Sequence, residues 1–151
     1  MSIKGVHLVL SQQSKRMLNE QPKQFRKGTA SGVKSAMQNL ESDARKNFSG
    51  ANQLKTRSGY LRRSISYGVY EAGDMYVGTI GSDAIYAAIH EFGGVITASA
   101  KQYLTFKGQN GWVKVKSVTI PPRPFLANSI ERNKKRMSRE IVDYINRSLK
   151  L

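Results

Sequence analysis

The adjacent residues His90 and Glu91, in the stretch YAAIHEFGG at residues 86–94, are the first candidates for chemistry in this sequence. An imidazole and a carboxylate can bind a metal ion or take part in general acid–base catalysis. The helical zinc signature needs a second histidine four residues after the first, but that position is Gly94. The other histidine, His7, is far away in sequence. A structural role is therefore favoured over catalysis, with one side chain of the pair facing inward and the other outward on a short helix.

Other chemical signatures are missing from the sequence. It has no cysteine, which excludes disulfides and thiolate metal sites. It has no nucleophile motif, no phosphate-binding glycine loop, and no set of nucleophile, base and orienting group. The GTIG at residues 78–81 matches the short glycine clamp of one RNA-binding fold, but residues 65–98 contain no Lys or Arg to support it, so we interpret these as turn glycines. We expect no enzymatic activity and no cofactor.

The first long element is a helix. Residues 3–10 are typical of a strand, and Pro22 is suited to the first position of the helix that follows. An apolar stripe at helical spacing predicts that this helix continues to about Phe48. Gly28 and Gly32 disfavour helix, so we expect its first turns to be irregular. The stripe consists of Val33, Met37, Leu40 and Ala44.

The middle of the chain favours strands. Residues 65–70 and 75–81 flank a turn-like tetrad at 71–74, which predicts an antiparallel hairpin. A second hairpin is predicted from 102–107 to 112–120 across residues 108–111. Its apolar residues change face part-way along the second strand, which predicts a β-bulge near Lys116 or Ser117.

The C-terminal part predicts a last helix opened by Pro124, with an apolar stripe that lapses at Asn133 and Lys134. We therefore expect an α+β fold, an antiparallel sheet packed by a long N-terminal helix and by this C-terminal helix, in one domain spanning residues 1–151. A separate polar stripe on the last helix is either a solvated face or a partner-binding face. It consists of Arg132, Arg136, Arg139, Asp143 and Arg147.

Charge is the most distinctive bulk property, with a formal net charge of +15. Residues 1–64 carry a net +10, residues 65–98 carry −4 with no Lys or Arg, and residues 99–151 carry +9. Such a balance favours contact with nucleic acid, an anionic surface or an acidic protein, and it also permits contact between copies of the chain. The only N-terminal apolar run, residues 6–10, is too short for a membrane span or signal sequence, so we expect a soluble, unsecreted protein without a membrane partner.

Three stretches together resemble a known family. They are TRSGYLRRSI at 56–65, YAAIHEFGGVI at 86–96 and IPPRPFLANSI at 120–130. In this order, with helices at both ends, they are similar to the head–tail joining (neck) and tail-completion proteins of tailed bacteriophages, including the phage virion morphogenesis family. The region at about 97–120, which we predict to be a protruding hairpin, is more variable in such proteins, and the resemblance leaves its role open.

The resemblance implies a structural component of the virion neck or tail end that is present in the host cytoplasm during assembly. It implies no enzymatic activity and a ring, expected to be a hexamer, at the top of the tail. The expected partners are other copies of the chain, the head-connector or head-closure protein, and the tail-terminator or tail-tube protein. Genomic DNA would pass nearby without its sequence being read.

Candidate subunit-interface residues come from the acidic middle segment and the diagnostic motifs. Glu91 and Arg123 are hypothesised to form an ion pair, within a chain or across a subunit boundary, because Arg123 precedes a helix N-terminus and needs an anion nearby. Head-to-tail contact would bring the acidic segment against a basic region of the next copy. The interface candidates are Asp74, Asp83, Glu91, Phe92, Arg123 and Phe125, and the apolar residues that could face outward are Tyr67, Tyr76 and Phe92.

The alternative function is that of a basic nucleic-acid-binding protein. Such a protein would place base-stacking aromatic residues among its basic residues. The sequence instead has five of its aromatic residues in the segment that lacks Lys and Arg, which disfavours this class: Tyr67, Tyr70, Tyr76, Tyr86 and Phe92. The basic residues that could face a partner or DNA are Arg62, Arg63, Arg132, Arg136 and Arg139.

Overall fold

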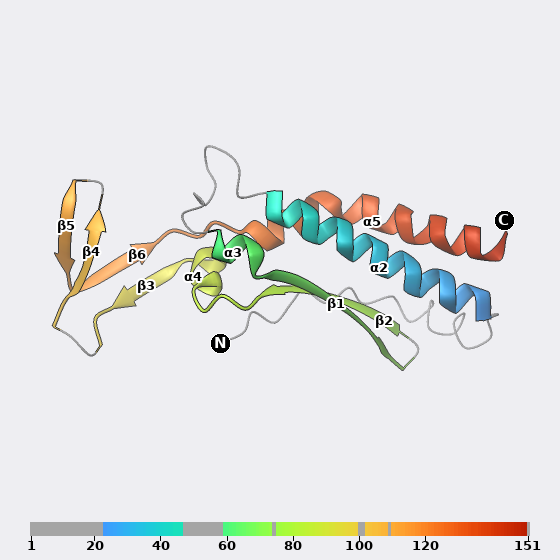
Figure 1. Cartoon of the computed structure of the whole chain (residues 1–151), viewed down its shortest axis with the longest axis horizontal. Coiled ribbons are helices and arrows are strands. Elements are labelled where there is room, and N and C mark those ends of the chain that lie inside the picture. Colours follow the sequence, from blue (N-terminus) through green and yellow to red (C-terminus); the bar gives the residue numbers. More distant parts are fainter. Residues whose placement is uncertain (1–22, 47–58, 74, 100–101, 109, 151) are drawn as a thin grey trace.

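The structure of the protein is a computed structural model that describes residues 23–46, 59–73, 75–99, 102–108 and 110–150. The molecule is elongated, with two long helices at one end and two thin β-ribbons projecting from the other (Figure 1). Its elements, in chain order, are α2 (Lys23–Lys46), α3 (Tyr60–Arg63), β1 (Ile65–Ala72), β2 (Met75–Ser82), α4 (Ala87–Phe92), β3 (Gly94–Thr97), β4 (Leu104–Gly108), β5 (Gly111–Val115), β6 (Ser117–Ile120) and α5 (Phe125–Leu149).

The predicted α+β class is confirmed: antiparallel strands are combined with long N-terminal and C-terminal helices. The whole predicted stripe of α2 is buried, and it faces the β1–β2 hairpin and α5. Helix α5 packs mainly on α2 rather than on the sheet. A two-stranded ribbon is only about 5 Å wide between strand axes and a helix is about 10 Å across, so one ribbon has room for one helix. The predicted strand at 3–10 and the helix limits Pro22 and Phe48 lie outside the described residues.

Gly28 and Gly32 do not disrupt α2, and the prediction of irregular first turns is wrong. Both glycines are buried where α2 and α5 cross at close range. A Cβ placed on Gly32 would lie 2.9 Å from the Cα of Ile141, and one on Gly28 would lie 2.7 Å from the Cβ of Ser148. The absence of a side chain thus lets the two helix backbones approach each other, which outweighs the low helix propensity of glycine.

Polar contacts fix the register of the antiparallel pair α2 and α5. Glu140 accepts hydrogen bonds from Ser35 and from the Asn39 amide, the latter at 2.8 Å. One turn further along the seam, Asn133 Nδ2 donates to Asp43 Oδ2 at 2.8 Å. Asn133 is buried, so the lapse in the apolar stripe of α5 is an interhelical hydrogen-bonding position. Directional bonds of this kind favour one alignment of the two helices over a shifted one.

The β1–β2 hairpin matches its prediction, with a tighter turn than the expected tetrad. Ala72 pairs with Met75, which leaves a loop of two residues, and Gly73 has a φ of 60° that favours glycine. Asp74 lies outside the described residues. The face that meets α2 includes Ile65 and Ile80, both buried.

The projecting part of the molecule consists of two ribbons, β3–β6 and β4–β5, which we call the arm (residues 94–120). Only β4 and β5 form the second predicted hairpin, since β6 pairs with β3. The predicted β-bulge is also wrong, because the chain has a break between two strands at this position. Strand β5 ends at Val115, Lys116 forms a bend, and the next strand, β6, pairs with β3. A bulge and a strand break both shift the side-chain alternation by one residue, so the sequence pattern could not separate them.

Replacing Gly32 by Ala tests the close helix contact. The added methyl meets the α5 backbone, so overpacking should exceed the gain in helix propensity, and we expect the free energy of unfolding to fall by about 1–2 kcal/mol. The matched control is Ser31→Ala at the next, exposed position of α2, where the propensity gain acts alone. Urea denaturation of both variants provides the measurement. A Gly32→Ala protein as stable as the Ser31→Ala protein would contradict the packing account.

Candidate functional site

The His90–Glu91 segment forms a buried corner between α4 and α5. The Glu91 side chain is only 4% exposed. Its Oε2 accepts hydrogen bonds from the backbone N–H groups of Phe125 at 2.8 Å and Leu126 at 3.0 Å, and its Oε1 accepts one from Ala127 at 2.9 Å. These three donors belong to the first turn of α5, where backbone N–H groups have no partner within the helix. Glu91 therefore serves as a cap, supplied from a distant part of the chain, for the positive end of α5.

This geometry corrects the predicted ion pair between Glu91 and Arg123 in its form within one chain, while the form across a subunit boundary stays a prediction. An anion does lie at the helix N-terminus, as expected, but both of its oxygens bind backbone N–H groups. No Glu91–Arg123 ion pair occurs among the described residues. The backbone N–H of Arg123 instead donates to the carbonyl of His90 at 2.7 Å, and the Arg123 residue is exposed. Backbone capping was missed because residue types at the two motifs do not reveal which donor group a carboxylate will meet.

His90 packs beside this cap. Its ring lies edge-on to the Tyr86 ring, with centroids 5.9 Å apart. Burial and, to a smaller extent, the nearby Arg123 guanidinium lower the pKa of His90. Within the part of the chain that the structure describes, its Nδ1 has no hydrogen-bond partner and no group of three metal-ligating side chains occurs. The expectation that one member of the pair faces inward is met by Glu91, with His90 half-buried.

Two glycines and a proline complete the corner. Gly93 ends α4 with a φ of 71°, a backbone conformation that favours glycine. A Cβ placed on Gly93 would lie 2.8 Å from Pro122 Cδ, so a larger residue would push the two diagnostic motifs apart. The stretches at 86–96 and 120–130, remote in sequence, are thereby joined at the root of the arm (Figure 1).

The other interface candidates do not gather on one face. Phe92 is 70% exposed and Asp83 is exposed, whereas Phe125 belongs to the buried core. Glu71 lies at the far tip of the β1–β2 hairpin, with Oε1 3.8 Å from the Arg26 guanidinium. The acidic segment is thus distributed in space, and the capping role of Glu91 removes one of its charges from the surface. Of the apolar candidates, Tyr67 and Tyr76 are half-buried against the core, so only Phe92 projects strongly.

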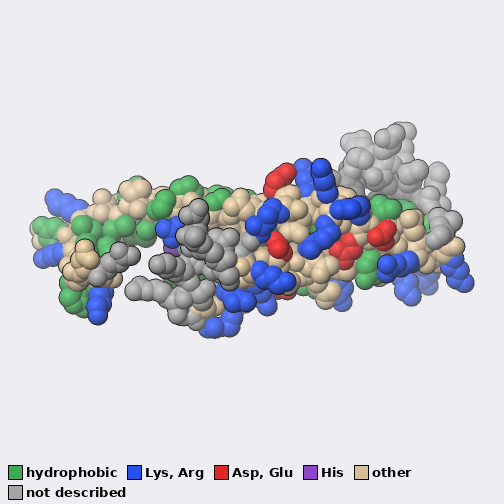
Figure 2. All heavy atoms as spheres, turned by 90° about the horizontal axis from the view of Figure 1, so that it is seen from above, with side chains coloured by type: hydrophobic (Ala, Val, Ile, Leu, Met, Phe, Trp, Pro, Cys, Tyr) green, Lys and Arg blue, Asp and Glu red, His purple; other side chains and the backbone are tan. Residues whose placement is uncertain are grey.

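The basic candidates are exposed on separate elements. Arg62 and Arg63 point outward from α3, as predicted, while Leu61 and Ile65 share the buried face. The α5 stripe of Arg132, Arg136 and Arg139 is also exposed, and Figure 2 shows Lys and Arg side chains interspersed with acidic ones over the two helices. Arg132 Nη2 lies 3.0 Å from Asp43 Oδ2, so this arginine also supports the α2–α5 seam.

The arm presents two surfaces that the sequence interpretation did not identify. On β3–β6 the register places Ile96, Val118 and Ile120 on one face. On β4–β5 it places Leu104, Phe106, Val113 and Val115 on one face and Thr105, Lys107, Trp112 and Lys114 on the other. The alternation at residues 103–115 was the available signal, and it also shows that Tyr103, Phe106 and Trp112 lie among lysines, contrary to the expected separation of aromatic and basic residues.

Several apolar residues of the arm and its root remain exposed. Besides Phe92, the exposed large apolar side chains in this region are Ile85, Tyr86, Val95, Ile96, Phe106 and Trp112. Figure 2 shows apolar side chains gathered over this end of the molecule. Two-stranded ribbons are marginal in water without a layer against their apolar face. The arm is therefore the part of the molecule that is best suited to contact a partner.

Comparison with protein families decides the assignment. A model of the phage virion morphogenesis family matches residues 4–150. The chain belongs to this family. Comparisons with curated proteins and with solved structures gave no match. Membership of the phage virion morphogenesis family confirms the resemblance seen in the sequence and indicates a role in building the phage particle. Among the described residues, no helix is long and apolar enough to span a membrane.

Removing the Glu91 carboxylate should destabilise the fold. Glu91→Ala leaves three backbone donors of α5 without their acceptor in a buried site, so we expect the free energy of unfolding to fall by roughly 2–4 kcal/mol. Glu71→Ala is the control, because the exposed contact with Arg26 should contribute less than about 0.5 kcal/mol. Denaturation midpoints of the two variants measure the difference. Equal midpoints would show that α5 does not depend on Glu91.

The lowered pKa of His90 predicts a pH-dependent stability. Because protonation is disfavoured in the folded state, the contribution of neutral His90 is complete above the ordinary pKa of 6.5 and is lost as the pH falls through the lower folded value. The denaturation midpoint should therefore decrease between about pH 7.5 and pH 5.5, and His90→Gln should flatten this dependence. His7→Gln is the histidine control. An unchanged slope in the His90→Gln protein would assign the dependence to other groups.

Proposed function

We propose that this protein is a non-enzymatic structural component of the virion that joins the head to the tail or completes the tail end. In this proposal several copies form a closed ring around the passage for DNA, and the ring contacts the neighbouring head and tail proteins. The protein would act in the host cytoplasm during assembly and remain at the neck or tail end of the finished particle. Family membership supports the assembly role, and the uncovered arm is the observation that supports contact between copies.

The arm has the chemistry of a subunit contact. Its apolar face on β3–β6 includes Ile96, which is 42% exposed, and the ribbon continues directly from the rigid corner capped by Glu91. A projecting ribbon fixed at its root can reach a neighbouring molecule while the helical body keeps its own core. When such a contact joins two different surfaces of identical chains, it repeats from copy to copy and closes if the rotation permits.

Opposite charges contribute less to this contact than the sequence indicated. Glu91 is buried and Glu71 lies near Arg26, so Asp83 is the described acidic residue of the middle segment that could meet a basic region of the next copy. Apolar burial by the arm would then supply most of the affinity, with charge contributing mainly to orientation and approach.

Complementation of a phage that lacks this gene tests the role. Electron microscopy of lysates without the protein should show filled heads and finished tails that are not joined, or tails with incomplete ends. Assembled neck or tail-end structures should contain the protein as a ring when it is supplied. Fully joined, infectious particles in its absence would overturn the proposal, as would failure to form heads.

Two arm variants test the contact itself. Ile96→Asp places a charge on the apolar face of β3–β6, whereas Thr119→Asp places one on the opposite face of the same ribbon. Both sites are exposed, so the stability of the isolated chain should change by about 0.5 kcal/mol or less. We expect Ile96→Asp to abolish complementation and Thr119→Asp to retain it. Complementation by both variants would exclude this face as a subunit contact.

A further inference from the structure

The outer face of the β4–β5 hairpin combines an exposed indole with lysines. Thr105 pairs with Lys114 and Lys107 pairs with Trp112, so all four side chains lie on the same side of the ribbon. Each of these residues is exposed, and Trp112 is 76% exposed. This surface, which we call the Trp112 face, is distinct from the apolar face formed by Leu104, Phe106, Val113 and Val115.

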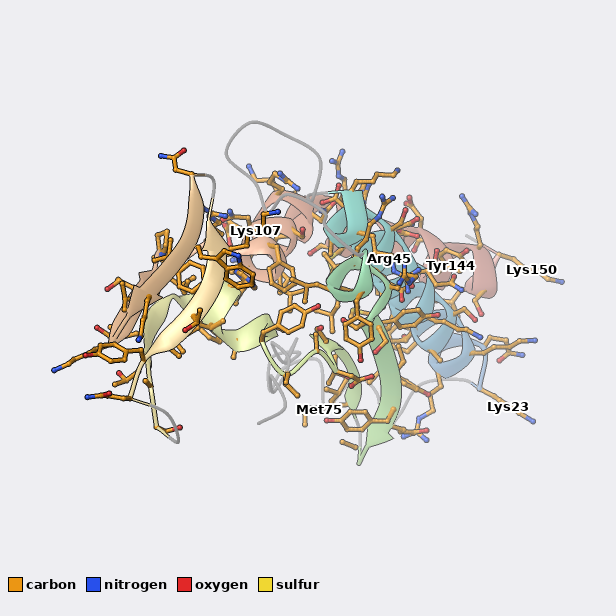
Figure 3. The ribbon with its side chains drawn as sticks, turned by 60° about the vertical axis from the view of Figure 1, so that its left-hand side comes forward. Lys23, Arg45, Met75, Lys107, Tyr144 and Lys150 are labelled. Carbon is orange, nitrogen blue, oxygen red and sulfur yellow. The ribbon has the colours of Figure 1, made fainter. Side chains whose placement is uncertain are left out.

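The positive charge of the Trp112 face has no acidic residue near it in sequence. Residues 92–130 contain no Asp or Glu, while the arm contains four lysines. Lys114 Nζ lies 4.6 Å from the centroid of the Tyr103 ring, which adds a second aromatic group and holds one ammonium beside it. Figure 3 shows Lys107 well separated from Lys23 and Lys150, which mark the end of the two helices that is remote from the arm.

A solvated surface explains lysines readily, but it does not explain an indole so exposed between them. Large aromatic side chains are costly to hydrate, and Trp112 has Lys107 as its cross-strand neighbour and Lys114 as its neighbour on the same face of β5. A ligand that combines negative charge with a flat apolar surface would satisfy both kinds of group. Nucleic acid has this combination, with phosphates for the lysines and bases that can stack on an aromatic ring.

We propose that the Trp112 face binds single-stranded nucleic acid without reading its sequence. Lys107 and Lys114 contact phosphates, and the Trp112 indole stacks on an unpaired base. A single strand is favoured over a duplex because bases within a duplex have their faces covered by their neighbours. This binding is independent of ring formation, since it uses the side of the hairpin opposite its apolar face.

The chain contains a single tryptophan, so its intrinsic fluorescence reports on this site alone. Titration with an oligothymidylate of about 20 nucleotides, a length that covers typical single-strand sites, should quench this emission saturably. The double variant Lys107→Gln/Lys114→Gln should weaken binding and reduce the slope of log affinity against log salt by roughly 1–2. Trp112→Leu should weaken binding of a fluorescein-labelled strand with little change in the salt slope.

Arg136→Gln/Arg139→Gln is the matched control, because it removes two exposed charges from α5. Denaturation midpoints verify that each variant is folded. Retention of affinity by the control and its loss in the lysine variant support the proposal. The proposal is overturned if the α5 variant alone loses affinity, if heparin produces the same quenching at the same charge concentration, or if duplex DNA binds more tightly without a change in Trp112 emission. Complementation assays do not enter this test, so failure here leaves the assembly role unaffected.

Discussion

The carboxylate of Glu91 at the N-terminus of α5 is the interaction on which the arrangement of the molecule depends. Three backbone donors of the first turn of α5 bind this one side chain, which comes from α4. Strand β3 begins two residues after α4 ends, and β6 leads into α5 through residues 121–124. The same contact therefore joins the two chain segments that enter and leave the arm. The hydrogen bonds between this buried anion and three N–H groups stabilise the junction. Because these bonds are directional, they also fix the orientation of α4 relative to α5, which apolar contact alone would not do.

The helical body and the arm have different physical bases. In the body, Gly28 and Gly32 allow α2 and α5 to approach closely, and Glu140 and Asp43 fix their register with hydrogen bonds across the seam. In the arm, each ribbon has two strands, and the described residues include no layer of comparable size over its apolar face. A stable body thus carries a segment that gains from contact with another molecule, which is suited to a protein that functions within an assembly.

The two faces of the β4–β5 hairpin connect this arrangement to the proposed roles. Antiparallel pairing places alternate residues on opposite sides, so one hairpin can present Phe106 to a protein and Trp112 to a polyanion. The proposed subunit contact and the proposed nucleic-acid contact use different faces of the arm, so the two proposals are compatible. The fixed root at Glu91 would hold both faces in a defined orientation relative to the helices.

Sequence patterns were sufficient to predict the two long helices, the buried stripe of α2, the first hairpin and the family. These depend on local periodicity, turn chemistry and short motifs, which are properties of neighbouring residues. A structural role for His90 and Glu91 could also be predicted, because the sequence has Gly94 where a zinc site would need a second histidine.

The contact partners of these groups became known only from the three-dimensional structure. Glu91 was expected to pair with Arg123 but accepts hydrogen bonds from three backbone N–H groups. Every residue except proline carries such a group, so the residue types do not indicate which ones a carboxylate will bind. Gly32 was expected to weaken a helix. The structure shows why a glycine is needed there, because a Cβ on Gly32 would lie only 2.9 Å from the Cα of Ile141 in α5. Strand β6 pairs with β3 and is not part of the predicted hairpin. The alternation of apolar and polar residues specifies which side chains share a face of a strand, but it does not specify the neighbouring strand.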